Sequence, residues 1–318
     1  MRSVFRNLVL LMLVFGIAVI SSAFTLGLVL GNMDNPYFVQ MAEAAKEQAK
    51  LLGIELIITN ANYDNATQLA QVENLIQRKV DAIVINPTDS KALIPAAEAA
   101  YKAGIPFVCI DRTVDSDLIS MDIESDNVMA GRLAAQYLAK RLNGKGKIAI
   151  IRGTIGLSVE RERNQGFIEE IKKYPGIQIV AEQSGNFNMA EGMAAAESIL
   201  TANPDLDAIY AENDPMGIGA VQAIKSMIGR LKNKNIFVVA VDASPAACDL
   251  IKKGEYLVFS SGQQPRKMTA MAINIAYLLA KGFKVETPDG SKRYFLEVIP
   301  VSKENVDWWI ETSVDGWH

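Results

Sequence analysis

Two charged residues that follow an apolar run are the clearest candidates for chemistry in this sequence. Residues 105–110 (Ile-Pro-Phe-Val-Cys-Ile) lead directly into Asp111 and Arg112. Such a run predicts a parallel strand buried on both faces, with Pro106 at its start, where a missing N–H costs least. Ligands of open α/β sheets bind just outside the carboxyl ends of the strands. A carboxylate and a guanidinium placed there could accept from one hydroxyl of a small polyol and donate to another, although a surface salt bridge is the alternative interpretation.

The composition excludes several kinds of site. The sequence has one histidine, His318, which is its last residue. A histidine-based triad, a histidine metal cluster and most histidine general-base chemistry are therefore excluded. The 36 acidic and 32 basic residues give a net charge of −4 and form no basic block, so nucleic acid is not an expected partner. We expect neither a cofactor nor a metal.

The two cysteines, Cys109 and Cys248, lie too far apart in the sequence to form a disulfide framework. Cys109 falls inside the predicted buried strand and Cys248 on a helix of the second half of the chain. A bridge between them would have to cross the gap between the two halves. We therefore expect two free, buried thiols.

The first 23 residues have the pattern of an export signal. Arg2 and Arg6 form a short basic region, residues 8–20 are apolar, and Ser21-Ser22-Ala23 is a small-residue cleavage site. A membrane anchor over residues 8–30 is the alternative. Residues 25–30 are better explained as a strand, which leaves the apolar segment too short to span a bilayer. Because no cysteine follows the apolar segment, a lipid-anchored N-terminus is not indicated either, and we expect a cleavable signal peptide over 1–23 and an exported chain.

The elements that would position Asp111 and Arg112 alternate between strands and helices. They are predicted, in chain order, as a strand over 25–30, a helix over 39–52, a strand over 54–58, a helix over 66–79, a strand over 82–85, a helix over 92–103 and the strand over 105–110. This alternation is typical of right-handed βαβ units in an α/β domain with a parallel sheet. A chain of 318 residues is long enough for two such domains.

The second half of the chain repeats this plan. Its predicted strands, which correspond in order to the four of the first half, cover 147–153, 176–180, 206–210 and 236–242. Asp242 then occupies the strand end equivalent to Asp111, and Asn213 the one equivalent to Asn86. A long unit that occurs only twice indicates two similar, doubly wound parallel-sheet domains rather than a solenoid. Polar strand ends from both domains would converge on one enclosed gap, which favours a ligand site there.

These residues, in their order and spacing, resemble the type I periplasmic sugar-binding proteins of ABC transporters, most closely the ribose-binding members. The similarity covers nearly all of the chain after the signal. The matching pieces are Asn35-Pro36-Tyr37-Phe38, Ile85-Asn86-Pro87-Thr88-Asp89-Ser90, Asp111-Arg112, Ser125-Asp126-Asn127, Arg161-Glu162-Arg163 with Gly166-Phe167, Phe187, Asn213-Asp214, Val241-Asp242, and Gln263 before Pro265.

The resemblance implies a set of sugar contacts: Asn35, Tyr37, Phe38, Asp111, Arg112, Arg161, Phe187, Asn213, Asp242 and Gln263. The aromatic rings would cover the C–H faces of a sugar, although ordinary core packing is the alternative for them. The carboxylates would accept from hydroxyls, the guanidinium groups would donate, and the amides could do both. Tyr37 stands where the ribose-binding pattern has Phe, so the sugar need not be ribose itself.

The resemblance also implies how the chain would work. Crossings between the domains near Ser125, Gln263–Gln264 and Glu297 would form a three-strand hinge. The lobes would then comprise 24–125 plus 264–297, and 126–263 plus 298–318. The expected ligand is a monosaccharide, D-ribose or a related pentose, and another small sugar or sugar alcohol is the alternative. Binding of this ligand would favour closure of the periplasmic protein, and a membrane ABC permease would recognise the closed form. We expect a monomer; a chemoreceptor is a further candidate partner.

Two rival functions lack their sequence signatures. A dinucleotide-dependent enzyme would need G-x-G-x-x-G after the first strand, whereas residues 31–36 read Gly-Asn-Met-Asp-Asn-Pro. A sugar-responsive repressor would need an N-terminal helix-turn-helix, and the export signal stands in its place. The chain is therefore expected to bind a ligand and not to be an enzyme. We expect Trp308, Trp309 and Trp317, near the C-terminus, to cover a hydrophobic edge.

Overall fold

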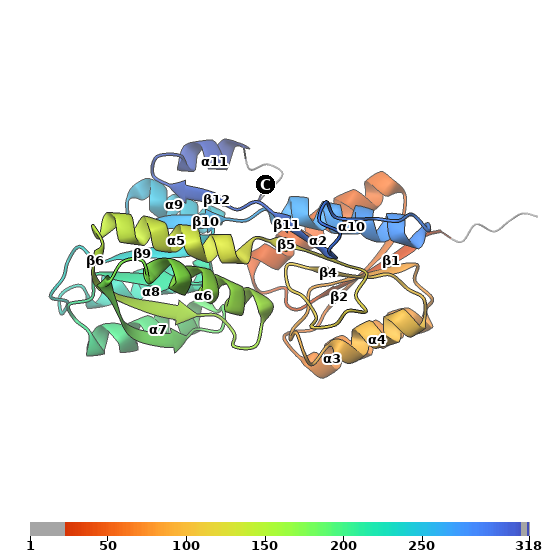
Figure 1. The fold of residues 1–318 in the computed structure, drawn as a ribbon, viewed down its shortest axis with the longest axis horizontal. Coiled ribbons are helices and arrows are strands. Elements are labelled where there is room, and N and C mark those ends of the chain that lie inside the picture. Colours follow the sequence, from red (N-terminus) through yellow and green to blue (C-terminus); the bar gives the residue numbers. More distant parts are fainter. Residues whose placement is uncertain (1–22, 313–316, 318) are drawn as a thin grey trace, which may run out of the picture.

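The protein forms two lobes that lie side by side, each built on its own sheet (Figure 1). The structure is a computed structural model, and it describes residues 23–312 and residue 317. The predicted signal segment, apart from Ala23, and His318 lie outside the described residues. Among the described helices, none is long and apolar enough to cross a membrane.

The first lobe is a doubly wound parallel sheet. Its elements up to the first crossing are β1 (Thr25–Leu30), α2 (Pro36–Leu52), β2 (Glu55–Asn60), α3 (Asn65–Gln77), β3 (Ala82–Ile85), α4 (Ile94–Lys102), β4 (Phe107–Ile110) and β5 (Met121–Ser125). With β11 (Arg293–Leu296), the strands lie in the order β11-β5-β4-β3-β1-β2, and all pairs are parallel. Helices α2 and α10 (Pro265–Ala280) cover one face, and α3 and α4 cover the other (Figure 1).

The second lobe has the same order of strands. Its elements are α5 (Asn127–Arg141), β6 (Lys145–Arg152), α6 (Ser158–Ile171), β7 (Gly176–Ser184), α7 (Met189–Ala202), β8 (Ala208–Ala211), α8 (Asp214–Met227), β9 (Phe237–Asp242), α9 (Pro245–Lys253), β10 (Leu257–Gly262), β12 (Ile299–Ser302) and α11 (Val306–Thr312). Its sheet runs β12-β10-β9-β8-β6-β7, with only β12 antiparallel among these strands. The predicted α/β fold with two similar domains is confirmed.

The chain passes between the two sheets three times. It leaves the first sheet after β5, returns after β10, and leaves again between β11 and β12. Two hydrogen bonds join the crossing segments. The amide of Asp126 donates to the Leu296 carbonyl at 3.0 Å, and the Gln264 side chain donates to the Glu297 carbonyl at 3.1 Å. This course supports the predicted hinge and lobe boundaries, which stay a prediction.

Two local features differ from the sequence-based expectation, and a third agrees with it. Helix α2 begins at Pro36 and not at residue 39, because Asn35 accepts from the Tyr37 amide at 2.9 Å as N-cap and Pro36 fits the first helical position. Tyr37 therefore lies in the first helical turn. Strand β5 was not predicted, because its buried acidic side chains interrupt the apolar pattern. Cys109 and Cys248 are free and buried, as expected.

Helices α5 and α6 approach each other unusually closely. A Cβ atom on Gly131 would lie 2.0 Å from the carbonyl oxygen of Arg163, and one on Gly166 would lie 1.9 Å from that of Val128. Side chains at these two positions would force the helices apart. The two glycines thus allow α6 to lie close against α5.

Candidate ligand-binding site

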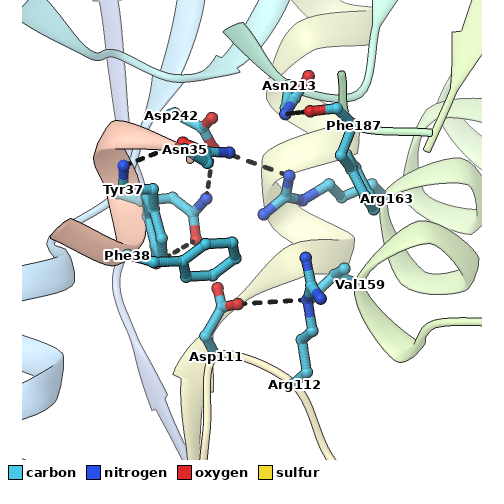
Figure 2. Close-up of a pocket in the computed structure, with 11 residues that line it drawn as sticks. Asn35, Tyr37, Phe38, Asp111, Arg112, Val159, Arg163, Phe187, Asn213 and Asp242 are labelled. Carbon is cyan, nitrogen blue, oxygen red and sulfur yellow. Dashed lines mark hydrogen bonds and ion pairs between the residues drawn. The ribbon is translucent and has the colours of Figure 1, made fainter. Parts of the chain in front are cut away.

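A pocket lies between the lobes, at the carboxyl ends of both sheets (Figure 2). It is lined by Asn35, Tyr37, Phe38, Asp111, Arg112, Val159, Arg163, Phe187, Asn213, Asp242 and Gln263. This lining combines aromatic rings with a few convergent polar groups, as small-molecule sites do. Nine of the ten residues predicted to contact the ligand line it; the exception is Arg161.

The backbone at the pocket is held in unusual conformations. Asp111, Phe187 and Asp242 have positive φ angles of 66°, 56° and 123°. Residues other than glycine seldom adopt such angles, and they persist only where the surroundings enforce them. Asp111 directly follows β4 and Asp242 ends β9, so a residue with positive φ lies at both strand ends. Both residues line the pocket.

On the side of the first lobe, the pocket is lined by Asp111, which has two polar neighbours, and by Arg112, which has few hydrogen bonds of its own. The Asn86 amide donates to Asp111 Oδ2 at 2.9 Å, and Nε of Arg112 lies 3.5 Å from the same oxygen. The Arg112 side chain is buried, yet its one hydrogen bond within the described residues is a long one, 3.5 Å, from Nη1 to the Pro87 carbonyl. Its guanidinium lies over the Phe38 ring at 5.2 Å. Most of its N–H groups are therefore available to a ligand.

On the side of the second lobe, Asp242 is placed by amide and guanidinium donors. Gln263 donates to Asp242 Oδ1 at 2.6 Å, and Nη1 of Arg163 lies 3.7 Å from that oxygen. Burial raises the pKa of Asp242 to about 6, while Arg163 and Gln263 oppose the shift. Burial alone would lower the pKa of Arg163, but Asp242 and Asp111 raise it above its ordinary value. The guanidinium is therefore a permanent cation.

Tyr37 joins the two lobes across the pocket. Its hydroxyl donates to Oε1 of Gln263 at 3.3 Å. Burial, and then the nearby Asp111 and Asp242, raise the pKa of Tyr37 well above its ordinary value. The side chain therefore stays a neutral phenol, whose hydroxyl can both donate and accept.

The side chains of Asn35 and Asn213 line the pocket, but their amide oxygens already accept hydrogen bonds from the protein. Oδ1 of Asn35 caps α2, and Oδ1 of Asn213 caps α8 by accepting from the Met216 amide at 3.0 Å. Nδ2 of Asn213 also donates to the Phe187 carbonyl at 3.3 Å. Because both amide oxygens serve as helix caps, these residues can offer a ligand mainly their N–H groups.

Arg161 is not in the pocket, which corrects the placement implied by the resemblance. Its side chain is 46% exposed, donates to the Gly156 carbonyl at 2.8 Å and pairs with Asp115 of the other lobe at 3.3 Å. Arg163 takes the pocket position instead, because residues two apart on a helix face nearly opposite sides. The buried spacing Val159, Arg163, Phe167 along α6 is the signal that could have found it.

Polar contacts outside the pocket lining join the two lobes. Besides the Arg161–Asp115 pair, the Thr113 amide donates to the Ser158 hydroxyl at 3.2 Å, and Arg293 pairs with Glu162 at 2.8 Å. Since both partners of each contact come from different lobes, the structure shows the lobes in a closed arrangement.

Two buried carboxyl groups lie behind the pocket and outside its lining. Burial raises the pKa of Glu212 to about 8, although its Oε2 accepts from the Gly153 amide at 2.7 Å. Burial and Asp242 raise the pKa of Asp214 to about 8 as well. Both groups stay protonated at neutral pH in the folded chain. Among the described residues, no group of His, Cys, Asp and Glu is arranged to hold a metal ion.

These two carboxyl groups make stability depend on pH in a definite direction. A carboxyl group whose pKa is higher in the folded state stabilises the fold most below its unfolded pKa, and that stability is lost as the pH rises to about 8. We expect the melting temperature to fall between pH 5 and pH 8.5, and Glu212→Gln to flatten this dependence. Exposed Glu73 offers the control Glu73→Gln. Unchanged steepness in Glu212→Gln, measured by thermal denaturation, would refute the assignment.

Known proteins that resemble this chain in sequence, and solved structures that resemble it in fold, are all binding proteins for solutes. The family described as "Periplasmic binding protein domain" matches residues 26–284. The ribose import binding protein of Bacillus subtilis (strain 168) is 37% identical over 265 residues, which are 83% of this chain and 84% of that protein. An ABC transporter solute-binding protein of Bacillus halodurans C-125, solved with myo-inositol, superposes with a TM-score of 0.83 at 31% identity, covering 90% of this chain and 96% of its own. A periplasmic solute-binding protein of Actinobacillus succinogenes 130z, solved with D-allose, gives 0.81 at 32% identity, with 89% and 99% covered.

Proposed function

The chain belongs to the periplasmic binding proteins, the solute-binding proteins of sugar ABC transporters, and on that premise we propose that it captures D-ribose or a related pentose between its lobes. Proteins of this kind bind and deliver a solute and are not enzymes. Another small sugar or a sugar alcohol is the alternative ligand. The observation that carries the proposal is that two carboxylates and two guanidinium groups, one pair from each lobe, are buried around one pocket.

Each group in the pocket matches a part of a monosaccharide. Asp111 and Asp242 would accept from hydroxyls, and Arg112 and Arg163 would donate to hydroxyl or ring oxygens. Because two acids face two bases, the pocket can remain near neutral while each bond to a ligand is charge-assisted. Phe38 and Phe187 would cover the apolar C–H faces of the ring.

Closure would couple binding to transport. A sugar that contacts both walls stabilises the closed arrangement only through those contacts, and a membrane ABC permease would recognise that arrangement. We propose that residues 1–23 direct export to the periplasm and that the mature chain acts as a monomer, with lobes of 24–125 plus 264–297 and 126–263 plus 298–318. A chemoreceptor partner stays a prediction, which no observation on the described residues favours.

The identity of the sugar depends on Tyr37. Its hydroxyl donates a hydrogen bond to Gln263, occupies space at one side of the pocket and offers a ligand an additional polar contact. The similar proteins named above include one solved with D-allose and one with myo-inositol. These two compounds and D-ribose are therefore the first to test.

A thermal-shift panel tests the proposal. The ligand-stripped protein is melted with D-ribose, other pentoses, D-allose, myo-inositol and further hexoses. At a concentration about 100 times the dissociation constant, a bound sugar stabilises by about 2.7 kcal/mol, which predicts a rise of about 4 °C for a chain of this size. The Asp111→Ala variant should show no such rise. If a folded protein responds to none of these compounds, the proposal is wrong.

A further inference from the structure

The segment after β12 places two indole rings directly behind the pocket. Trp309 of α11 and Trp317 are buried, whereas the neighbouring Trp308 is 52% exposed. Trp309 lies against Gly262 at the end of β10, where a Cβ atom would come within 2.9 Å of its ring. Covering a hydrophobic edge, as the sequence predicts, accounts for this packing. It does not account for the hydrogen bonds that the two indoles make.

Both indole N–H groups donate to consecutive backbone carbonyls at the strained end of β9. Nε1 of Trp317 donates to the Asp242 carbonyl at 3.1 Å, and Nε1 of Trp309 donates to the Ala243 carbonyl at 3.0 Å. Asp242 and Ala243 have positive φ angles of 123° and 51°. Backbone in such conformations costs free energy and must be held by its surroundings. The two indoles therefore hold the turn that aims the Asp242 carboxylate into the pocket.

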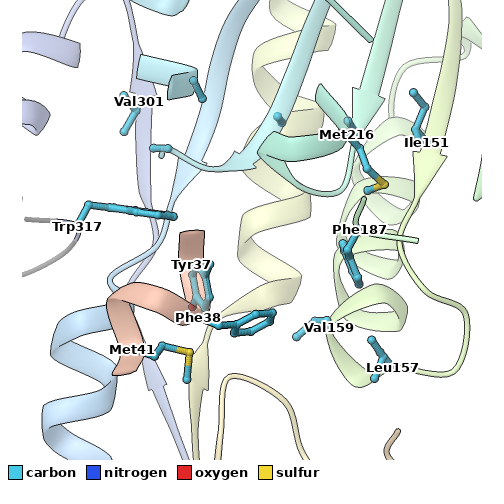
Figure 3. Packing of buried hydrophobic residues seen from close by; sticks show 14 of the residues in the cluster. Tyr37, Phe38, Met41, Ile151, Leu157, Val159, Phe187, Met216, Val301 and Trp317 are labelled. Atoms are coloured by element: carbon cyan, nitrogen blue, oxygen red, sulfur yellow. The ribbon is translucent and has the colours of Figure 1, made fainter. Parts of the chain in front are cut away.

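Trp317 also reaches the opposite lobe. Its ring meets that of Tyr37 edge to face, with centroids 5.6 Å apart and planes at 72° (Figure 3). Aromatic pairs favour this geometry. Tyr37 belongs to α2 of the first lobe, while Asp242 belongs to β9 of the second. One side chain thus contacts a pocket residue from each lobe while lying outside the pocket lining itself.

We propose that Trp309 and Trp317 are positioning residues of the binding site: they fix the Asp242 turn from behind, and Trp317 adds a contact that ties the closed lobes together at Tyr37. The inference rests on the proposed function, because the pocket it shapes is the proposed sugar site. It assigns to the C-terminal segment a role in ligand affinity.

The indole N–H group and the aromatic ring of Trp317 make separate contacts, which a substitution can distinguish. Replacing Trp317 by Phe keeps an aromatic ring near Tyr37 but removes the donor to the Asp242 carbonyl, which then keeps only its bond from the Gln263 amide at 3.0 Å. One buried hydrogen bond corresponds to a change of about three- to tenfold in an equilibrium constant. Because the bond restrains the closed site, its loss should mainly speed ligand release.

The test compares Trp317→Phe and Trp309→Phe with the matched control Trp308→Phe in the exported protein. Stopped-flow binding is measured with D-ribose, or with whichever of D-allose and myo-inositol binds the unaltered protein. We expect about three- to tenfold faster release for Trp317→Phe and Trp309→Phe, and wild-type release for Trp308→Phe. A purely structural role would lower the folded fraction but leave the release rate of folded molecules unchanged, and that result would overturn the proposal.

Hydrogen exchange of the ligand-free protein gives a second, sugar-independent readout. In peptides that cover residues 237–248, exchange should be faster in Trp309→Phe and Trp317→Phe than in Trp308→Phe. If the unaltered protein binds no sugar, the proposed function fails while this comparison still decides whether the indoles hold the turn. Equal exchange in all three variants would refute the positioning role.

Discussion

Arg163→Met is expected to weaken sugar binding by about thirtyfold or more, whereas Arg161→Met should weaken it by less than about fivefold. The Arg163 guanidinium is buried beside Asp242, and removing it leaves that carboxylate unpaired in a desolvated pocket, which costs roughly 2–5 kcal/mol. Arg161 forms a half-exposed pair with Asp115 and donates to the Gly156 carbonyl, both outside the pocket lining, and exposed pairs of this kind contribute about 0–1 kcal/mol. Calorimetric titration of both variants measures the difference.

The comparison needs a check that the first variant folds. Arg163 also donates to the Asn127 side chain at 2.9 Å and to the Glu212 carbonyl at 2.7 Å, so its loss can loosen the second lobe. Arg163→Lys keeps the positive charge and removes only the planar fork, and it should still lose most of the affinity. If Arg161→Met loses binding while Arg163→Met retains it, the placement of the two side chains is wrong.

Gly131→Ala is expected to reduce both stability and sugar affinity. Its Cβ atom would lie 2.0 Å from the carbonyl oxygen of Arg163, so α6 must shift away from α5 and carry the guanidinium with it. Overpacking of this kind costs about 1–3 kcal/mol, even though Ala is the better helix former. Urea denaturation and calorimetry measure the two effects.

Gly229→Ala is the matched control for this prediction, because a Cβ atom there meets nothing within 4 Å. We expect it to bind and unfold like the unaltered protein. If Gly131→Ala also behaves like the unaltered protein, the close approach of α5 and α6 does not position Arg163.

The parts of the fold that the sequence predicted well are those with strong local signals. Buried strands such as β1 and β3 appear as unbroken apolar runs, and the structure places them over the predicted residues. The repeat was detectable because each lobe ends equivalent strands on equivalent polar residues, Asp111 and Asp242 among them. These signals can be recognised in each segment alone, without knowing which other segment packs against it.

The parts that the sequence predicted poorly depend on contacts between distant segments. Strand β5 carries Asp122 and Glu124, which are buried and pair with Arg293 of β11, a strand far away in the sequence. The choice between Arg161 and Arg163 depends on which face of α6 packs against the pocket, and a short motif does not show this. Trp317 reaches the site from the far end of the chain, so spacing alone could not connect it with Tyr37.

Calorimetric titration of the ligand-stripped protein with D-ribose, followed by the other sugars of the panel, tests the central claim most directly. We expect one-to-one binding of at least one monosaccharide or sugar alcohol with sub-micromolar affinity, and we expect Asp111→Ala to abolish this binding without unfolding the protein. Absence of heat with every compound, from a protein shown to be folded, would contradict a sugar site in this pocket. So would an Asp111→Ala variant that binds as tightly as the unaltered protein.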